Sequence, residues 1–199
     1  MMLKTELERR FGVVKTIIWR EKEFYLVTIP EIRDCQILMT SKLHHYEMVN
    51  PKEPSESKCF ELFFCLPNYW SESDLQNNEW THSIMDQLMT YVIDHKTWFG
   101  DGHTMQIKNE NGALSWPLNQ SHCMLSTPIL LRDELKTIDL GDKQVSFLSI
   151  MPLFKQEFQF KQAYGTNKLL ELFEQRQVTE RIDGFRTNLA KSRWRRIFG

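Results

Sequence analysis

The sequence is poor in the features that usually reveal a function directly. Its 199 residues include only four cysteines, which form no Cys-x-x-Cys pair, so neither a disulfide framework nor a paired zinc site is indicated. No apolar run reaches the ~18 residues of a membrane span, and the charged first ten residues lack the apolar core of a signal peptide. The cytoplasm is therefore the expected compartment, and no metal or other cofactor is expected.

An excess of charge of one sign is also lacking. The 25 lysines and arginines nearly balance the 26 aspartates and glutamates, which gives a formal net charge of -1. Such a chain has no overall field that would attract nucleic acid or an anionic membrane surface. The local exception is the basic C-terminal end, residues 181–199, which holds Arg181, Phe185, Arg186, Lys191, Arg193, Trp194, Arg195 and Arg196. That mixture of basic and aromatic residues keeps a regulator that binds nucleic acid as an alternative function.

Catalytic motifs are missing as well. There is no Gly-x-Ser-x-Gly elbow, no His-Glu-x-x-His pair and no Gly-x-x-x-x-Gly-Lys-Ser/Thr phosphate loop. The nearest glycine-rich segment, Gly100–Thr104, has Asp101 at its centre, where a carboxylate repels phosphate, and it predicts a tight turn between helix and strand. His103 is the most obvious general base, and Asp101 is the acid nearest to it in the sequence. A small hydrolase or transferase that uses this pair is therefore a further alternative.

The chain does contain ample material for a core. Hydrophobic residues make up 41% and aromatic residues 12%, and the length suits one domain. Apolar residues at helical spacing predict helices over 3–11 and 81–95, and two more after residue 154 that are separated by Gly165. Apolar and β-branched runs predict strands over 24–29, 36–40, 59–66, 105–107, 123–131, 135–140 and 145–153. We predict an α+β fold, in which a mixed, largely antiparallel β-sheet is flanked by α-helices in a single domain over 1–199.

Three side chains invite a specific interpretation. Tyr69 and Trp70 follow the continuous apolar run of 59–66 in a polar loop, so both are candidate exposed anchors, although Trp70 could instead fold back over the core. Glu157 lies in a helical pattern and is expected to face solvent or to pair with Lys161, four residues on.

Several segments, taken in order, resemble the suppressor of fused domain family. They are the threonine-serine segment Ile37–Ser41, the Glu-Leu…Leu-Pro strand Phe60–Pro67 followed by Trp70, the turn Thr97–Thr104, and the carboxy-terminal strand Val145–Phe154 followed by Glu157, Lys161 and Gly165. The resemblance spans the expected core, residues 24–173, and the basic end lies outside it. One departure is Lys42, which stands where members of the family often have a glycine after the threonine-serine pair.

The resemblance implies a protein-binding domain that is not an enzyme. In animals the family restrains a transcription factor by clasping a short peptide, whereas bacterial relatives are often found beside polymorphic toxins and look like immunity proteins. A chain of this size resembles the bacterial type, so a toxin domain or peptide is the expected partner, and regulation of a transcription factor is the alternative. Tyr69 and Trp70 are the expected partner-binding residues, followed by Asp101 and His103.

Overall fold

The computed structural model describes residues 2–29, 32, 34–52, 57–71, 74, 79–107 and 120–190. Its helices are α1 (Leu3–Phe11), the 3₁₀ turn η1 (Leu43–His45), α3 (Glu79–Asp94), α4 (Lys155–Tyr164) and α5 (Thr166–Gln175). Its strands are β1 (Val14–Trp19), β2 (Lys22–Thr28), β3 (Cys35–Thr40), β4 (Met48–Val49), β5 (Ser57–Pro67), β6 (Thr104–Gln106), β7 (His122–Ser126), β8 (Ile138–Asp139) and β9 (Gln144–Leu153). No helix in these ranges is long and apolar enough to cross a membrane.

The nine strands found in the described residues belong to one mixed sheet. The main order is β1-β2-β3-β5-β9-β7-β6, while β4 pairs with β5 and β8 pairs with β9. Among the described pairs, β5 and β9 run parallel and the others are antiparallel. The predicted α+β class with a largely antiparallel sheet is therefore confirmed. β5 occupies the centre, which explains why every residue of 59–67 is buried.

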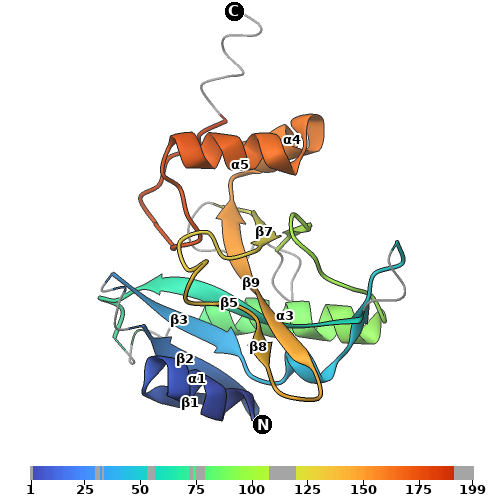
Figure 1. Ribbon diagram of the computed structural model, residues 1–199. Helices are drawn as coiled ribbons and strands as arrows, with labels where there is room; N and C mark the ends of the chain where they lie inside the picture. Colours follow the sequence, from blue (N-terminus) through green and yellow to red (C-terminus); the bar gives the residue numbers. More distant parts are fainter. Residues whose placement is uncertain are drawn as a thin grey trace, which may run out of the picture.

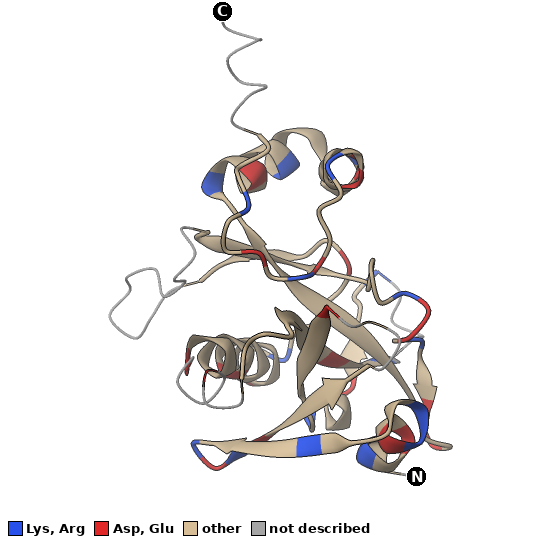
Figure 2. Cartoon of the chain, turned by 90° about the vertical axis from the view of Figure 1, so that its left-hand side faces the viewer, with Lys and Arg blue, Asp and Glu red and all other residues tan. Residues whose placement is uncertain are grey.

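Helices cover both faces of the sheet (Figures 1 and 2). On β2, Phe24 belongs to the core cluster under α3, whereas its neighbour Tyr25 belongs to the cluster under α1. Successive side chains of a strand point to opposite faces, so one strand supplies both clusters. The apolar stripe predicted for 81–95 is confirmed, because Ile84, Leu88 and Val92 of α3 are buried in the first cluster.

A third cluster lies at the far end of β9, where α4 and α5 form a pair of helices (Figure 1). Met151 and Leu153 of β9 pack there with Phe160 of α4 and with Leu169 and Phe173 of α5. Gly165 joins the two helices at a positive φ of 88°, a conformation that a residue with a side chain rarely adopts. The predicted break at Gly165 is thus confirmed, and it has this backbone reason.

Two strand predictions need correction. The strand predicted over 123–131 ends at Ser126, because the backbone N–H groups of Ile129, Leu130 and Leu131 donate to the buried Glu180 carboxylate instead of to a neighbouring strand. The strand predicted over 135–140 is reduced to Ile138–Asp139. In addition, β1 was not predicted, and it forms the outer strand of the sheet beside β2.

Candidate partner-binding surface

The turn that follows β5 holds two aromatic side chains in different environments. Tyr69 is 67% exposed. Trp70 is half-buried and packs edge-on against Trp80 of α3, with ring centroids 6.2 Å apart. Gln36 fixes the backbone of the turn, since its side-chain amide donates to the Trp70 carbonyl oxygen at 2.6 Å. The structure therefore turns Tyr69 toward solvent and lays Trp70 against the core.

The segment after α5, residues 176–190, returns to the sheet and lies beside the end of β5 (Figure 1). The backbone N–H of Ile182 donates to the Cys65 carbonyl oxygen at 2.8 Å. Two residues earlier, the fully buried Glu180 accepts three backbone N–H groups from the turn 129–131, at 2.8 to 3.1 Å. A carboxylate bound by several N–H groups is an efficient way to satisfy donors that are out of reach of water.

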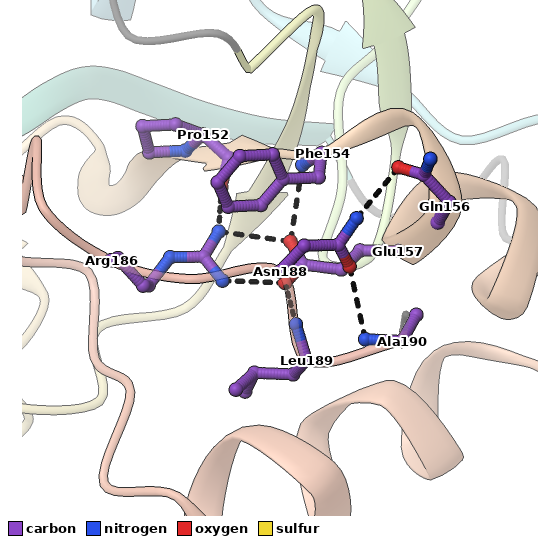
Figure 3. A network of polar contacts seen from close by, with 8 residues as sticks. All are labelled: Pro152, Phe154, Gln156, Glu157, Arg186, Asn188, Leu189 and Ala190. Atoms are coloured by element: carbon purple, nitrogen blue, oxygen red, sulfur yellow. Dashed lines mark hydrogen bonds and ion pairs between the residues drawn. The ribbon is translucent and has the colours of Figure 1, made fainter. Parts of the chain in front are cut away.

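A buried ion pair anchors the far end of the same segment (Figure 3). Glu157 of α4 is fully buried, and both of its oxygens accept from the guanidinium of Arg186, at 2.6 and 2.9 Å. Glu157 also accepts from the backbone N–H groups of Phe154 and Leu189, both at 3.1 Å. The expectation that Glu157 faces solvent or pairs with Lys161 is therefore wrong, because the carboxylate finds its cation 29 residues further along the chain.

Between the β5 turn and this segment lies a groove of about 770 Å³. Tyr69 lines one part of it, and Phe185 lines another. At 91%, Phe185 is the most exposed large apolar side chain among the described residues. Arg176 and Arg181 add positive charge to the groove, and Asp183 adds one carboxylate. The sequence identified Tyr69 as an anchor, but it presented Phe185 only as part of the basic end. Its exposure follows from the contacts on either side of it, which no local pattern reveals.

Asp101 and His103 occupy a tight turn, as predicted, that is fixed against β7. The Gly102 N–H donates to the Leu125 carbonyl at 2.7 Å, and the Leu125 N–H donates to the His103 carbonyl at 2.7 Å. Gly102 has a φ of +79°, and a Cβ at this position would lie 2.8 Å from the Thr166 hydroxyl at the start of α5. A glycine is therefore required here by the backbone and by the neighbouring helix.

The two side chains of this turn have separate environments. The Asp101 carboxylate accepts the Thr127 backbone N–H at 2.8 Å, and the described part of the chain shows no hydrogen bond between it and His103. The His103 ring packs edge-on against Trp98 at 4.4 Å, and burial, followed by the nearby positive charge of Lys161, lowers its pKa. This geometry gives no support to a hydrolase that would use the pair.

The expected partner-binding residues do not form one surface. Asp101 lines a smaller, mostly apolar hollow of about 330 Å³ together with Lys58 and Phe60, which lie at the start of β5. Tyr69 follows the other end of the same strand and lines the larger groove. The structure thus brings Tyr69 together with Phe185, and it separates both from the turn that holds Asp101 and His103.

The basic end contributes Arg181 and Phe185 to the groove, whereas the described residues provide no set of metal ligands. Among the described residues there is no group of three or more histidine, cysteine or acidic side chains placed to hold a metal ion. All four cysteines are buried free thiols, and burial raises the pKa of Cys123 to about 12. Of the residues in the nucleic-acid hypothesis, Arg186 is committed to Glu157, and Arg181 and Phe185 line the groove. The others, Lys191, Arg193, Trp194, Arg195 and Arg196, lie outside the described residues.

A family model described as Suppressor of fused protein (SUFU) matches residues 21–187, most of the chain. The chain belongs to the suppressor of fused family. The matched region includes the β5 turn and the segment 176–187, so both sides of the groove lie within the suppressor of fused domain. No curated protein sequence matches the chain.

Three solved structures show the same fold. A chain of a Sufu–Fu complex has a TM-score of 0.65 and 11% identity, with 97% of this chain and 91% of that chain covered. A Neisseria gonorrhoeae protein described as a suppressor of fused homologue has a TM-score of 0.66 and 15% identity, with 93% of each chain covered. Drosophila Suppressor of Fused has a TM-score of 0.67 and 11% identity, with 97% of this chain but 51% of that chain covered.

Proposed function

We propose that this suppressor of fused domain is a non-enzymatic module that inhibits a partner protein by occupying its surface. In the more specific form of the proposal, it is an immunity protein that neutralises a co-encoded toxin domain in the cytoplasm. The observation that carries the proposal is the groove in which exposed Tyr69 and Phe185 lie among Arg176 and Arg181. Aromatic and arginine side chains dominate the binding energy of many protein interfaces.

The energetics of the groove suit an interface. The apolar side chain of Phe185 is exposed to water in the free protein. When a partner covers such a side chain, its burial contributes about 1.5–3 kcal/mol to the binding free energy. The groove itself is held in place by the Glu180, Ile182 and Arg186 contacts, so little conformational entropy is lost there when a partner binds. A preformed surface with two aromatic anchors and a charged rim is typical of a binding protein.

The immunity role is supported by size and by the family. The Neisseria structure is matched over nearly the full length of both chains, whereas the Drosophila protein has about as much chain again beyond the match. The chain therefore corresponds to nearly the whole of the Neisseria form of the family and to about half of the Drosophila protein. In the Sufu–Fu complex, a chain of this fold is bound to another protein, which supports a protein as the partner here.

The test is a binding titration against the toxin domain encoded beside this protein. We expect a stable one-to-one complex, inhibition of the toxin at equal concentration, and no turnover of the toxin by the inhibitor. The double variant Tyr69→Ala and Phe185→Ala should weaken binding by about 100-fold, since two anchor truncations cost roughly 1–2 kcal/mol each. Tyr91→Ala on α3, which removes a tyrosine that is 48% exposed on another surface, is the matched control.

Two results would contradict the proposal. A failure to detect any complex at concentrations well above micromolar removes the toxin as the partner. Equal weakening by Tyr91→Ala and by the double variant shows instead that the groove is not the binding surface.

A further inference from the structure

A buried histidine and a buried glutamate form a second polar centre, remote from the groove. The Nδ1 atom of His44 lies 2.5 Å from Oε1 of Glu61, and the His44 backbone N–H donates to the same oxygen at 3.1 Å. Glu61 is fully buried, and the His44 side chain is 6% exposed. This centre joins the middle of β5 to η1, which follows the end of β3.

Neighbouring hydrogen bonds indicate which atom is the donor in the contact between His44 and Glu61. The Thr40 hydroxyl oxygen accepts the Leu62 backbone N–H at 2.9 Å, so its own proton is available for the Glu61 Oε2 atom that it contacts. With Glu61 accepting the His44 backbone N–H on Oε1 and the Thr40 hydroxyl on Oε2, Nδ1 of His44 is assigned as the donor of their bond. The second ring nitrogen of His44, Nε2, is left without a protein partner among the described residues.

The side chain of His44 lines a hollow of about 410 Å³ on the α1 side of the sheet. Because Nδ1 is bound to the fully buried Glu61, the ring nitrogen available to a ligand in this hollow is Nε2. The walls come from the start of α1, from β2, from the turn that follows β3, and from the turn between β8 and β9. The volume falls within the ~300–1,000 Å³ range of ordinary small-molecule sites.

The start of α1 adds a second, independent feature. Met2, Leu3 and Lys4 line the hollow, and the first amides of a nine-residue helix have no carbonyl partner within it. Met2 provides no side-chain cap for them. The positive end of the helix dipole therefore lies at the wall of the same hollow that His44 enters, and this arrangement favours an anion.

Lysines outnumber acids around the hollow. Lys4, Lys42 and Lys143 line it together with two acids, Glu23 and Asp142. Glu23 is already engaged, since Lys42 lies 3.7 Å from its carboxylate and the Tyr25 hydroxyl bonds to it.

Lys4 already donates to the Thr16 hydroxyl at 2.9 Å and lies 4.0 Å from the Glu8 carboxylate, so Lys143 is the cation that remains for a ligand. It is half-buried in the β8–β9 turn, and no ion pair of its side chain is found in the described part of the chain. Its charge also reaches His45, whose pKa is lowered by burial first and then by His44 and Lys143. Asp142, on the same turn, is the acid that partly offsets this charge.

We propose that this hollow binds a small tetrahedral oxyanion, such as phosphate or a phosphate ester, between the amino end of α1, Nε2 of His44 and Lys143. The α1 amides and the Lys143 ammonium donate to the anion, whereas Nε2 of His44, which is an acceptor when Nδ1 carries the proton, accepts the P–OH hydrogen of a hydrogen phosphate. The three groups come from three separate elements, which suits an anion whose oxygens point in several directions. The described lining holds no arginine, whose planar fork is the usual partner of a carboxylate. A divalent cation is disfavoured by the lysines and by the missing cluster of ligands among the described residues.

The test is calorimetric titration of the full chain with inorganic phosphate, with acetate as the comparison anion. We expect saturable one-to-one binding of phosphate and much weaker binding of acetate. His44→Asn, whose amide can still donate to Glu61, and Lys143→Ala should each weaken phosphate binding about tenfold, whereas Lys168→Ala on α5 should leave it unchanged. In nitrogen NMR spectra, phosphate should shift Nε2 of His44 and leave the exposed His95 unaffected.

Each contrary result overturns the proposal. Phosphate that shows no saturation, or that binds the Lys143→Ala and Lys168→Ala proteins equally well, means that the hollow is not an anion site. Acetate that binds as tightly as phosphate removes the tetrahedral assignment. If His44→Asn does not fold, Lys143→Ala decides the outcome, because Lys143 lies in a surface turn away from the buried Glu61. Neither variant touches the Tyr69 groove, so the toxin titration is independent of this one.

Discussion

Individual side chains that are largely buried hold the C-terminal segment in place. Arg186 has its side chain only 10% exposed, binds both oxygens of Glu157, donates to the Pro152 carbonyl at 3.0 Å and lies over the ring of Phe154 (Figure 3). An ion pair this deep is costly to form, because both charges lose water, but it is costlier to break on one side alone.

The first prediction is that Arg186→Met lowers the free energy of unfolding by about 3–5 kcal/mol, since it leaves the Glu157 charge buried without its cation. Denaturant titration measures this change. Lys168→Met is the matched control, because it removes a surface ion pair with Glu171 and should cost less than about 1 kcal/mol. If the two variants lose equal amounts of unfolding free energy, the buried Glu157–Arg186 pair stabilises the protein no more than a surface pair does.

This residue also shows where local sequence rules stop. The rule that places a partner four residues along a helix predicted Lys161 for Glu157, but the true partner lies on a segment that follows two complete helices. The same limit applies to the candidate site. Tyr69 was predicted from the polar loop after an apolar run, whereas the exposure of Phe185 depends on long-range contacts that no window of sequence contains.

At the scale of elements, α1 is a clear case of sequence specifying local structure. The spacing of Leu3, Leu7 and Phe11 predicted its observed bounds, and Gly12 ends it at a φ of 87°. By contrast, β1 was not predicted, because Lys15 and other exposed side chains of an outer strand blur its apolar pattern. Apolar sequence patterns predict an element well when one of its faces is buried at a regular spacing. They predict poorly for an outer strand of the sheet, where more side chains are exposed.

A pH experiment tests how α1 is held. The guanidinium groups of Arg9 and Arg10 bind the Glu6 carboxylate, and these hydrogen bonds are the main cause that lowers its pKa from 4.5 to about 2. A lowered pKa in the folded state stabilises the protein above the unfolded value, and this contribution disappears as the pH falls from 4.5 through 2. We therefore expect Glu6→Gln to be less stable than the natural protein well above pH 4.5, with the difference closing near pH 2.

Urea unfolding at a series of pH values measures the effect. Glu8→Gln is the control on the same helix, since Glu8 is more exposed and lies 4.0 Å from its nearest cation, Lys4. A stability difference between the natural protein and Glu6→Gln that stays constant across this range would contradict the prediction.

At the scale of the whole molecule, the order of the strands limits what the sequence could predict. Each strand prediction rests on a local pattern, but the parallel pairing of β5 with β9 joins segments separated by α3 and three further strands. The fold class could be predicted from composition and the alternation of elements, whereas the centre of the sheet and both sides of the groove could not. Those features depend on which distant segments bury the most surface together.

A pair of truncations tests whether the C-terminal segment belongs to the folding unit. A chain that ends at residue 190 retains the Glu180, Ile182 and Arg186 contacts, and it should unfold in one cooperative thermal transition. A chain that ends at residue 175 loses all three, leaving the Glu157 charge and the amides of 129–131 without partners, and should lose its cooperative transition. Similar transitions for both chains would show that the segment is only an appendage.

The central position of β5 also has a consequence for biosynthesis. On the ribosome, β1, β2, β3 and β5 emerge early and can pair with one another in order, but β9 leaves the exit tunnel only after many more residues. Until then, the nascent chain presents a long apolar strand with one bare hydrogen-bonding edge, which is the kind of edge that recruits other chains. Slow or interrupted translation between these two strands is therefore the stage at which this protein is most exposed to aggregation.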